Sequence, residues 1–337
     1  MRFLRYFSIF FVLGYMAWYF SADKTPYQNI SGQTMGTYYN IKIRTLKEDN
    51  MLSQKIKQHM DELNRKMSVF DPKSEISRLN NAKAEEWIEL SPEMSQVMKN
   101  AAKIWKMSNG AFDPTIGKLV DLWGFGSAVP QKTPSETEIK EVMKHTGFNK
   151  LKFADNYTRV KKNNDAIYIN LSAIAKGYGV DSITNLLEKE GYTDFIVEIG
   201  GEVVARGKRS EDDNGWKIGV VKPDENQGNA FVVTLKNLAV ATSGDYRNYY
   251  YKDGKKYSHT ISPKNGYPVE HNLASVTVFN NSCMEADALA TAAMAMGEEK
   301  ALQFANDNNL ALVMFVRQND ESLKTLISTN AKKIIGD

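Results

Sequence analysis

The chain has 337 residues, of which 42% are hydrophobic and 25% are charged, so it can form one large domain or two ordinary ones and lacks the composition of a disordered protein. Its 43 basic and 40 acidic residues leave a net charge of +3 spread along the chain, which gives no electrostatic case for nucleic acid as a partner. One cysteine, Cys283, and four histidines exclude a disulfide framework and a Cys/His zinc cluster.

The N-terminus has the pattern of a secretory signal or a short membrane anchor. Arg2 and Arg5 precede an apolar run over residues 6–20, and a polar stretch follows it. The alternative, a buried helix of the folded body, is disfavoured by the basic start. Phe20 is too bulky for a good cleavage site, and no cysteine follows the run that could carry a lipid. We therefore expect residues 1–22 to be an uncleaved inner-membrane anchor, with the body of the protein on the periplasmic face.

The first half of the chain predicts one short strand and two helices, the first of them amphipathic. Residues 23–31 are expected to form a tether, and Thr37–Ile43 alternates like a strand. Apolar residues at three- and four-residue spacing predict a helix over 48–67. A second helix is expected over 91–110, opened by Ser-Pro and stopped by Asn-Gly. Residues 126–138 are rich in Pro, Ser and Thr and predict a surface loop.

The second half mixes strands and helices without a regular βαβ rhythm. A strand over Ile167–Asn170 should feed a helix over Ile174–Glu190, and the strand Phe195–Ile199 follows with a Gly-Gly turn. A helix over Met284–Met296 precedes a last helix–strand pair that ends at Leu310–Val316. Further strands are predicted at residues 217–221, 231–235, 239–242 and 275–279. This mixture indicates an α+β fold.

Asp287 and Thr291 form the sharpest local feature, on a helix rich in Ala and Met. They are four residues apart, so both oxygens project from one helical face. A carboxylate and a hydroxyl are hard oxygen ligands that suit magnesium, which takes its other ligands from phosphate and water. The alternative is a helix cap, with Asp287 near the N-terminus complementing the helix dipole.

A second constellation runs from Asn170 to Asp181 through the sequence NLSAIAKGYGVD. A strand that enters a helix through small residues exposes backbone N–H groups and a favourable dipole to an anion. Lys176 adds a mobile positive charge. The alternative is an ordinary turn of small residues.

Two further segments carry candidate side chains. His259 lies between two hydroxyl residues and before a turn, and Asp245 follows a glycine. A single histidine is more often structural than catalytic. Trp123 and Phe125 flank Gly124 and can form a flat wall for an aromatic ring system, although such residues are by default part of the core.

Together and in this order, the motifs resemble the family of FAD:protein FMN transferases. The similarity covers roughly residues 30–325 and seven ordered blocks. These are GQTMGTY, the segment 112–125, LSAIAKGYGVD, VEIGGEV, ATSGDYRNYY, YSHTISPKNGYPV and CMEADALATAAMAMG. The resemblance implies a single two-lobed catalytic domain over residues 32–330, with mixed, largely antiparallel sheets and packed helices.

The resemblance also implies site residues. A magnesium ion beside the FAD pyrophosphate would be held by Asp287, Thr291 and the backbone oxygen of Ala173. The implied FAD contacts are Met35, Phe70, Trp123, Gly124, Phe125, Asn170, Lys176 and Ile261. Two of these positions depart from the family pattern, because Asn170 stands where Asp is common and Phe70 where a polar or Tyr side chain can occur.

The implied activity is magnesium-dependent transfer of the FMN part of FAD onto a Thr or Ser hydroxyl of a target protein, with release of AMP. The expected acceptors are flavin-carrying subunits of membrane redox complexes. As a hypothesis, His259 or Asp245 accepts the hydroxyl proton. The alternatives are a magnesium-dependent FAD pyrophosphatase, in which water replaces the protein hydroxyl, and a flavin-binding carrier without turnover.

Overall fold

The structure is a computed structural model that describes residues 26–126, 133–223, 228–245, 249–252, 254–320 and 322–335. The expected anchor, residues 1–22, lies outside these ranges. Within them, no helix combines the length and the apolar character needed to cross a membrane.

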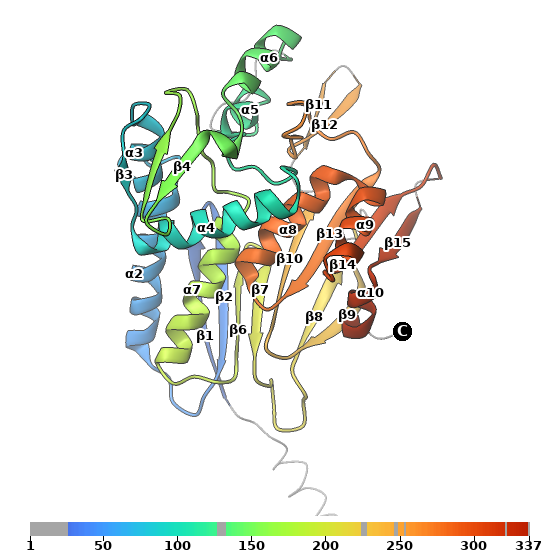
Figure 1. The fold of residues 1–337 in the computed structure, drawn as a ribbon. Coiled ribbons are helices and arrows are strands. Elements are labelled where there is room, and N and C mark those ends of the chain that lie inside the picture. Colours follow the sequence, from blue (N-terminus) through green and yellow to red (C-terminus); the bar gives the residue numbers. More distant parts are fainter. Residues whose placement is uncertain are drawn as a thin grey trace, which may run out of the picture.

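An eight-stranded sheet forms the centre of the fold (Figure 1). Every neighbouring pair of its strands is antiparallel. In spatial order the strands are β1 (Tyr27–Thr34), β2 (Thr37–Arg44), β6 (Phe195–Ile199), β7 (Glu202–Arg206), β10 (Leu238–Gly244), β13 (Leu273–Asn280), β14 (Ala311–Arg317) and β15 (Leu323–Ile327). The predicted α+β class with largely antiparallel strands is confirmed.

Helices cover one face of this sheet, and a hairpin with a short helix covers the other. Because side chains alternate along a strand, Ala239 and Ala241 of β10 face the helices, whereas Val240 faces the opposite layer. The helical layer contains α2 (Asn50–Met67), α4 (Pro92–Met107), α7 (Ala175–Lys189), α8 (Cys283–Met296) and α9 (Glu298–Asp307). The other layer contains β8 (Trp216–Val221), β9 (Asn229–Leu235) and α10 (Thr329–Ile335).

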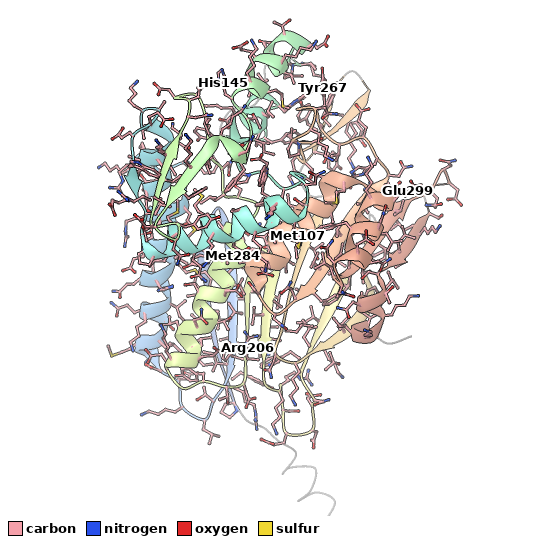
Figure 2. The ribbon with its side chains drawn as sticks, viewed as in Figure 1. Met107, His145, Arg206, Tyr267, Met284 and Glu299 are labelled. Atoms are coloured by element: carbon pink, nitrogen blue, oxygen red, sulfur yellow. The ribbon has the colours of Figure 1, made fainter. Side chains whose placement is uncertain are left out.

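Side chains fill the space between the helices and the sheet (Figure 2). Met284, at the start of α8, is buried and lies near α4. The small residues of α8 let it pack closely on β10, β13 and α7. This close packing brings the N-terminal parts of α7 and α8 together.

Smaller elements gather at one end of the main sheet (Figure 1). They are α3 (Glu75–Asn81), α5 (Gly117–Leu122), α6 (Glu136–Lys144), the 3-10 turn Phe148–Lys150, and a three-stranded sheet of β3 (Ile88–Glu89), β5 (Arg159–Lys162) and β4 (Leu151–Ala154). A separate hairpin, β11 (Tyr249–Lys252) and β12 (Lys255–Ser258), lies at the same end.

Three local predictions differ from the structure. Residues 27–31, expected in a tether, belong to β1, which pairs with β2. Ile167–Asn170 does not form a strand and makes only an isolated bridge between Tyr168 and Ile116. Within the loop expected at 126–138, Ser135 forms a capping box with Glu138 and starts α6.

Candidate active site

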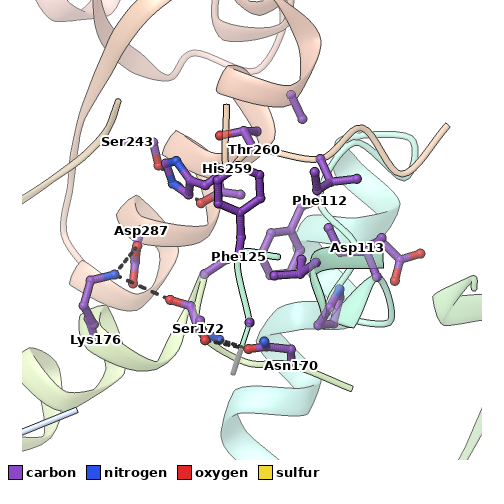
Figure 3. A pocket seen from close by; sticks show the side chains of 18 of the residues that line it. Phe112, Asp113, Phe125, Asn170, Ser172, Lys176, Ser243, His259, Thr260 and Asp287 are labelled. Carbon is purple, nitrogen blue, oxygen red and sulfur yellow. Dashed lines mark hydrogen bonds and ion pairs between the residues drawn. The ribbon is translucent and has the colours of Figure 1, made fainter. Parts of the chain in front are cut away.

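A cavity of about 450 Å³ opens at the end of the main sheet. Its walls come from separate parts of the chain: the loop after α4, the segment before α7, the first turn of α7, one face of α8, the end of β10, and the segment after β12. Candidate residues that line it are Phe70, Phe125, Asn170, Ala173, Lys176, His259, Ile261, Asp287 and Thr291. Figure 3 shows Lys176 and Asp287 at one end of the pocket and Phe112 and Asp113 at the other.

The close crossing of α7 and α8 fixes Asp287. A Cβ on Gly177 would lie 2.3 Å from the carbonyl oxygen of Cys283, so only glycine permits this approach. The Gly177 N–H donates to Oδ2 of Asp287 at 3.0 Å. In return, the carboxylate of Asp181 on α7 accepts from the N–H groups of Cys283 and Met284 at 2.8 and 3.0 Å. Each helix therefore satisfies free N–H groups at the start of the other.

Asp287 is not the cap of its own helix. Ser282 is the N-cap of α8 and accepts from the N–H of Glu285. The helix-cap alternative for Asp287 is therefore wrong, since its carboxylate serves α7 and faces the cavity.

Lys176 lies between two buried carboxylates. Its Nζ is 3.7 Å from Oδ1 of Asp287 and 3.5 Å from Oε1 of Glu202. Burial opposes the positive charge, but the two carboxylates outweigh it and raise the pKa of Lys176 above its ordinary value. Lys176 is therefore charged at neutral pH and lies within reach of an anion in the cavity.

Oxygen groups surround the position expected for a metal. Thr291 lies one helical turn after Asp287, and its Oγ1 is 3.3 Å from the hydroxyl of Ser243 on β10. The residues fit magnesium, because a carboxylate, hydroxyls and the nearby carbonyl of Ala173 form a hard oxygen donor set in one pocket. Among the described residues no three His, Cys, Asp or Glu side chains converge as a metal cluster, so a cation here would also need phosphate or water oxygens.

The segment before α7 has the irregular backbone expected of an anion site. The side chain of Asn170 accepts from both the N–H and the hydroxyl of Ser172, at 2.9 and 2.6 Å. Its backbone N–H donates to the carbonyl oxygen of Pro114 at 2.8 Å. These bonds hold the 170–174 turn against the loop that follows α4 and present Ala173 to the cavity.

An aromatic ladder supports the wall opposite the helices. Phe125 lines the cavity, with its ring 6.3 Å from that of His259. Behind it, Tyr250 stacks on Phe125 at 5.2 Å, Tyr257 stacks on Tyr250 at 5.2 Å, and Trp123 stacks on Tyr257 at 5.5 Å. The rings thus connect the cavity wall to the β11–β12 hairpin.

Four candidate residues do not line the cavity. Trp123 is buried and donates its indole N–H to Gly266, so it backs the wall together with Gly124. Met35 packs near Gly179 of α7. Asp245 is bonded by Arg317 and Lys256.

Phe70 has a different placement from the other candidates. It lines the cavity, yet 68% of its surface is exposed, which puts it at the rim.

Asp181, Glu202 and Ser243 have no role predicted from the sequence. All three lie inside or beside the blocks that carry the family resemblance, so their position was the available signal. What could not be read from the chain is that α7 and α8 exchange carboxylates and that Glu202 lies beside Lys176.

Comparisons with known proteins identify the family to which the chain is similar. Residues 35–314 match the model of the ApbE family. The chain is 37% identical over 321 residues to the FAD:protein FMN transferase of Haemophilus influenzae, covering 92% of each protein. The structure of the flavin transferase ApbE from Vibrio cholerae is similar with a TM-score of 0.84 and 36% identity, covering 92% of this chain and 100% of that one. The apo form of the flavinyl transferase ApbE from Pseudomonas stutzeri gives a TM-score of 0.85 at 31% identity, covering 93% and 98%.

Proposed function

The chain belongs to the ApbE family and is an FAD:protein FMN transferase, and from that premise we propose that it works with magnesium and modifies a Thr or Ser hydroxyl. The observation that supports the proposal is the meeting of Asp287, Thr291 and Lys176 with His259 in one cavity. Asp287, Thr291 and Lys176 are suited to bind a metal ion and a pyrophosphate, and His259 is suited to accept a proton.

The residues that would hold magnesium are Asp287, Thr291 and the backbone carbonyl of Ala173. Bound there, the ion would neutralise negative charge on the pyrophosphate of FAD and stabilise the leaving phosphate. Lys176 adds a second positive charge from the first turn of α7, where the helix dipole also favours an anion. The flavin would lie against Phe125 and Ile261, two apolar side chains of the wall.

The transfer step forms one bond and breaks one. The hydroxyl oxygen of the acceptor attacks the phosphorus on the FMN side of FAD, the bond between that phosphorus and the bridging oxygen breaks, and AMP leaves with this oxygen. The hydroxyl proton passes to the imidazole of His259. We prefer His259 over Asp245 as the acceptor of this proton because His259 lines the cavity, whereas Asp245 is held by two cations outside it.

The acceptors we propose are flavin-carrying subunits of membrane redox complexes. The basic start and the apolar run of residues 1–22 support an inner-membrane anchor with the catalytic domain on the periplasmic face. Anchoring would keep the enzyme close to acceptors in the same membrane.

The test is mass spectrometry of a flavoprotein acceptor after incubation with the enzyme, FAD and magnesium. A covalent FMN adduct on one Thr or Ser, formed only with magnesium, would support the proposal. An adduct that forms equally well without magnesium would contradict the metal requirement, and an adduct on another type of side chain would contradict the Thr or Ser acceptor.

A further inference from the structure

Three charged side chains outside the cavity meet where the β11–β12 hairpin joins the main sheet. They are Asp245, directly after β10, Arg317, at the end of β14, and Lys256, on β12. Arg317 donates to both oxygens of Asp245, at 2.7 and 2.8 Å. Lys256 donates to Oδ2 of the same carboxylate at 2.9 Å. We call this group the ionic pin.

The ionic pin joins two separate sheets. Asp245 is tied to the main sheet through its own N–H, which donates to Ala274, and Arg317 through its N–H, which donates to Asn272. Lys256 belongs to the hairpin, whose two strands form a sheet of their own. The carboxylate of Asp245 is only 10% exposed, so its two bonds to Arg317 and its bond to Lys256 form in a partly dehydrated place where ion pairs are stronger than at the surface.

The hairpin in turn carries a cavity wall. Lys256 is three residues before His259, a distance of about 10 Å along an extended strand. His259, Thr260 and Ile261 follow β12 directly and line the cavity. On its other side the hairpin is held by the aromatic ladder, because Tyr250 and Tyr257 stack between Phe125 and Trp123.

From this arrangement we propose that Asp245, Arg317 and Lys256 are positioning residues that set the place of His259 in the cavity. The ionic pin fixes the hairpin on the side of the main sheet, and the ladder fixes it on the side of the α5 loop. The pin acts through His259 and does not touch the reactants. The inference rests on the proposed role of His259 in the transfer step.

The test uses the full-length enzyme and three changes that weaken the ionic pin by degrees. Lys256→Met removes one cation, Arg317→Gln removes the two-bond partner, and Arg317→Lys keeps a positive charge but loses the paired geometry. Lys252→Met is the matched control, because Lys252 lies on the same hairpin and makes no bond to Asp245 in the described contacts. Single-turnover FMN transfer, FAD affinity and hydrogen exchange of the peptide 249–262 are measured for each.

We expect Lys256→Met and Arg317→Gln to slow transfer about ten- to a hundredfold, since a shift of about 1 Å in a reacting group has this effect. FAD affinity should change less than about threefold, because the metal ligands, Lys176 and Phe125 lie on other elements and only Ile261 of the flavin wall follows the hairpin. Arg317→Lys should recover part of the rate, and Lys252→Met should match the wild type. Exchange of peptide 249–262 should become faster only in the two damaging variants.

A double variant separates this inference from the proposed function. Lys256→Met combined with His259→Gln should be no slower than His259→Gln alone, because the pin acts through that imidazole. Additive losses, or wild-type transfer in both damaging variants, would overturn the inference. If His259→Gln alone keeps the full rate, the proposed proton acceptor is wrong, and the exchange of peptide 249–262 then decides whether the pin holds the hairpin at all. Unchanged hydrogen exchange of this peptide would show that the ionic pin does not hold the hairpin and would overturn the inference as well.

Discussion

The two carboxylate oxygens of Asp287 serve different partners. Oδ2 accepts the N–H of Gly177 and so fixes the side chain on α7, while Oδ1 faces the ammonium of Lys176 across 3.7 Å. One oxygen is thus held by a backbone N–H, which orients the side chain, and the other can coordinate a metal ion.

Asp287→Asn tests the charge and keeps the hydrogen bond. An amide oxygen can still accept from Gly177, so α7 and α8 should stay together and the melting temperature should change by no more than a few degrees. Loss of the only carboxylate of the proposed metal site should abolish measurable magnesium binding by titration calorimetry and slow transfer at least about a hundredfold.

Glu285→Gln is the matched control, since it removes a carboxylate from the same helix at a position bonded to Lys103, away from the cavity. It should bind magnesium as the wild type does. Wild-type magnesium affinity in Asp287→Asn would place the metal elsewhere.

At the level of helices, Asp181 repeats this arrangement in the opposite direction. Its carboxylate accepts from two backbone N–H groups and the hydroxyl of Ser282 at the start of α8, where those groups have no partner within the helix. Asp181→Ala should lower the free energy of unfolding by about 1–3 kcal/mol, the usual cost of leaving buried donors unpaired. Chemical denaturation measures this value.

The same variant should also weaken magnesium binding, because α8 carries Asp287 and Thr291. Asp61→Ala is the control for removal of an acidic residue, since Asp61 forms an exposed pair within α2. Equal stability of the two variants would show that the exchange of carboxylates between α7 and α8 contributes little.

Tyr178 gives α7 a signature in alkaline solution. Burial and the nearby charge of Glu93 raise the pKa of Tyr178 to about 12. A group whose pKa is raised on folding stabilises the fold below its unfolded pKa, about 10, and that contribution is lost as the pH rises toward 12. Tyr178→Phe should therefore lose less stability than the wild type between pH 10 and 12, as measured by urea unfolding at each pH.

Tyr38→Phe is the control for the loss of a tyrosine hydroxyl, because Tyr38 is 52% exposed. Parallel curves for Tyr178→Phe and the wild type would contradict the assigned cause.

The elements that the sequence predicted best have strong local signals. α2 was predicted from apolar spacing, and α4 was predicted from its Ser-Pro start, which is confirmed by its cap at Ser91. The prediction of a strand over Ile167–Asn170 was wrong, because the apolar residues of this segment are buried but no neighbouring strand pairs along it. The hairpin β11–β12 was missed, since its strands YYYK and KKYS show no alternation of apolar and polar residues and its place depends on the aromatic ladder.

The candidate site, too, could be predicted only in part from the sequence. Nine of the site residues that were predicted from the sequence line the cavity. Asp245 and its partner Arg317 are 72 residues apart, and Asp181 and its partner Cys283 are 102 residues apart, so neither bond has a signal in the local sequence. Such contacts follow only from the packing of the whole sheet.

At the scale of the whole molecule, the cavity opens at one end of the main sheet. The described part of the chain begins beside β1, which is an edge strand of that sheet. A catalytic body on an anchor would meet acceptors in the same membrane at a high effective concentration, typically in the millimolar range for a short flexible link. The anchor would then contribute to the rate without contacting the site.

Deletion of residues 1–22 tests this contribution. The shortened enzyme should move from the membrane fraction to the soluble fraction, because the apolar run of residues 6–20 is the segment expected to insert. Its transfer to a soluble acceptor domain should stay within about twofold, since the cavity is built from residues 69–295. Its transfer to a membrane-bound acceptor should fall at least about tenfold, because the shared surface no longer concentrates the two proteins.

Fractionation and an adduct assay on both acceptors measure these effects. Replacing residues 1–22 with an unrelated anchor should restore transfer to the membrane acceptor, because only tethering is lost on deletion. Failure of that replacement, with the soluble acceptor still modified, would mean that residues 1–22 recognise the acceptor themselves. A full-length chain found in the soluble fraction would rule out the anchor.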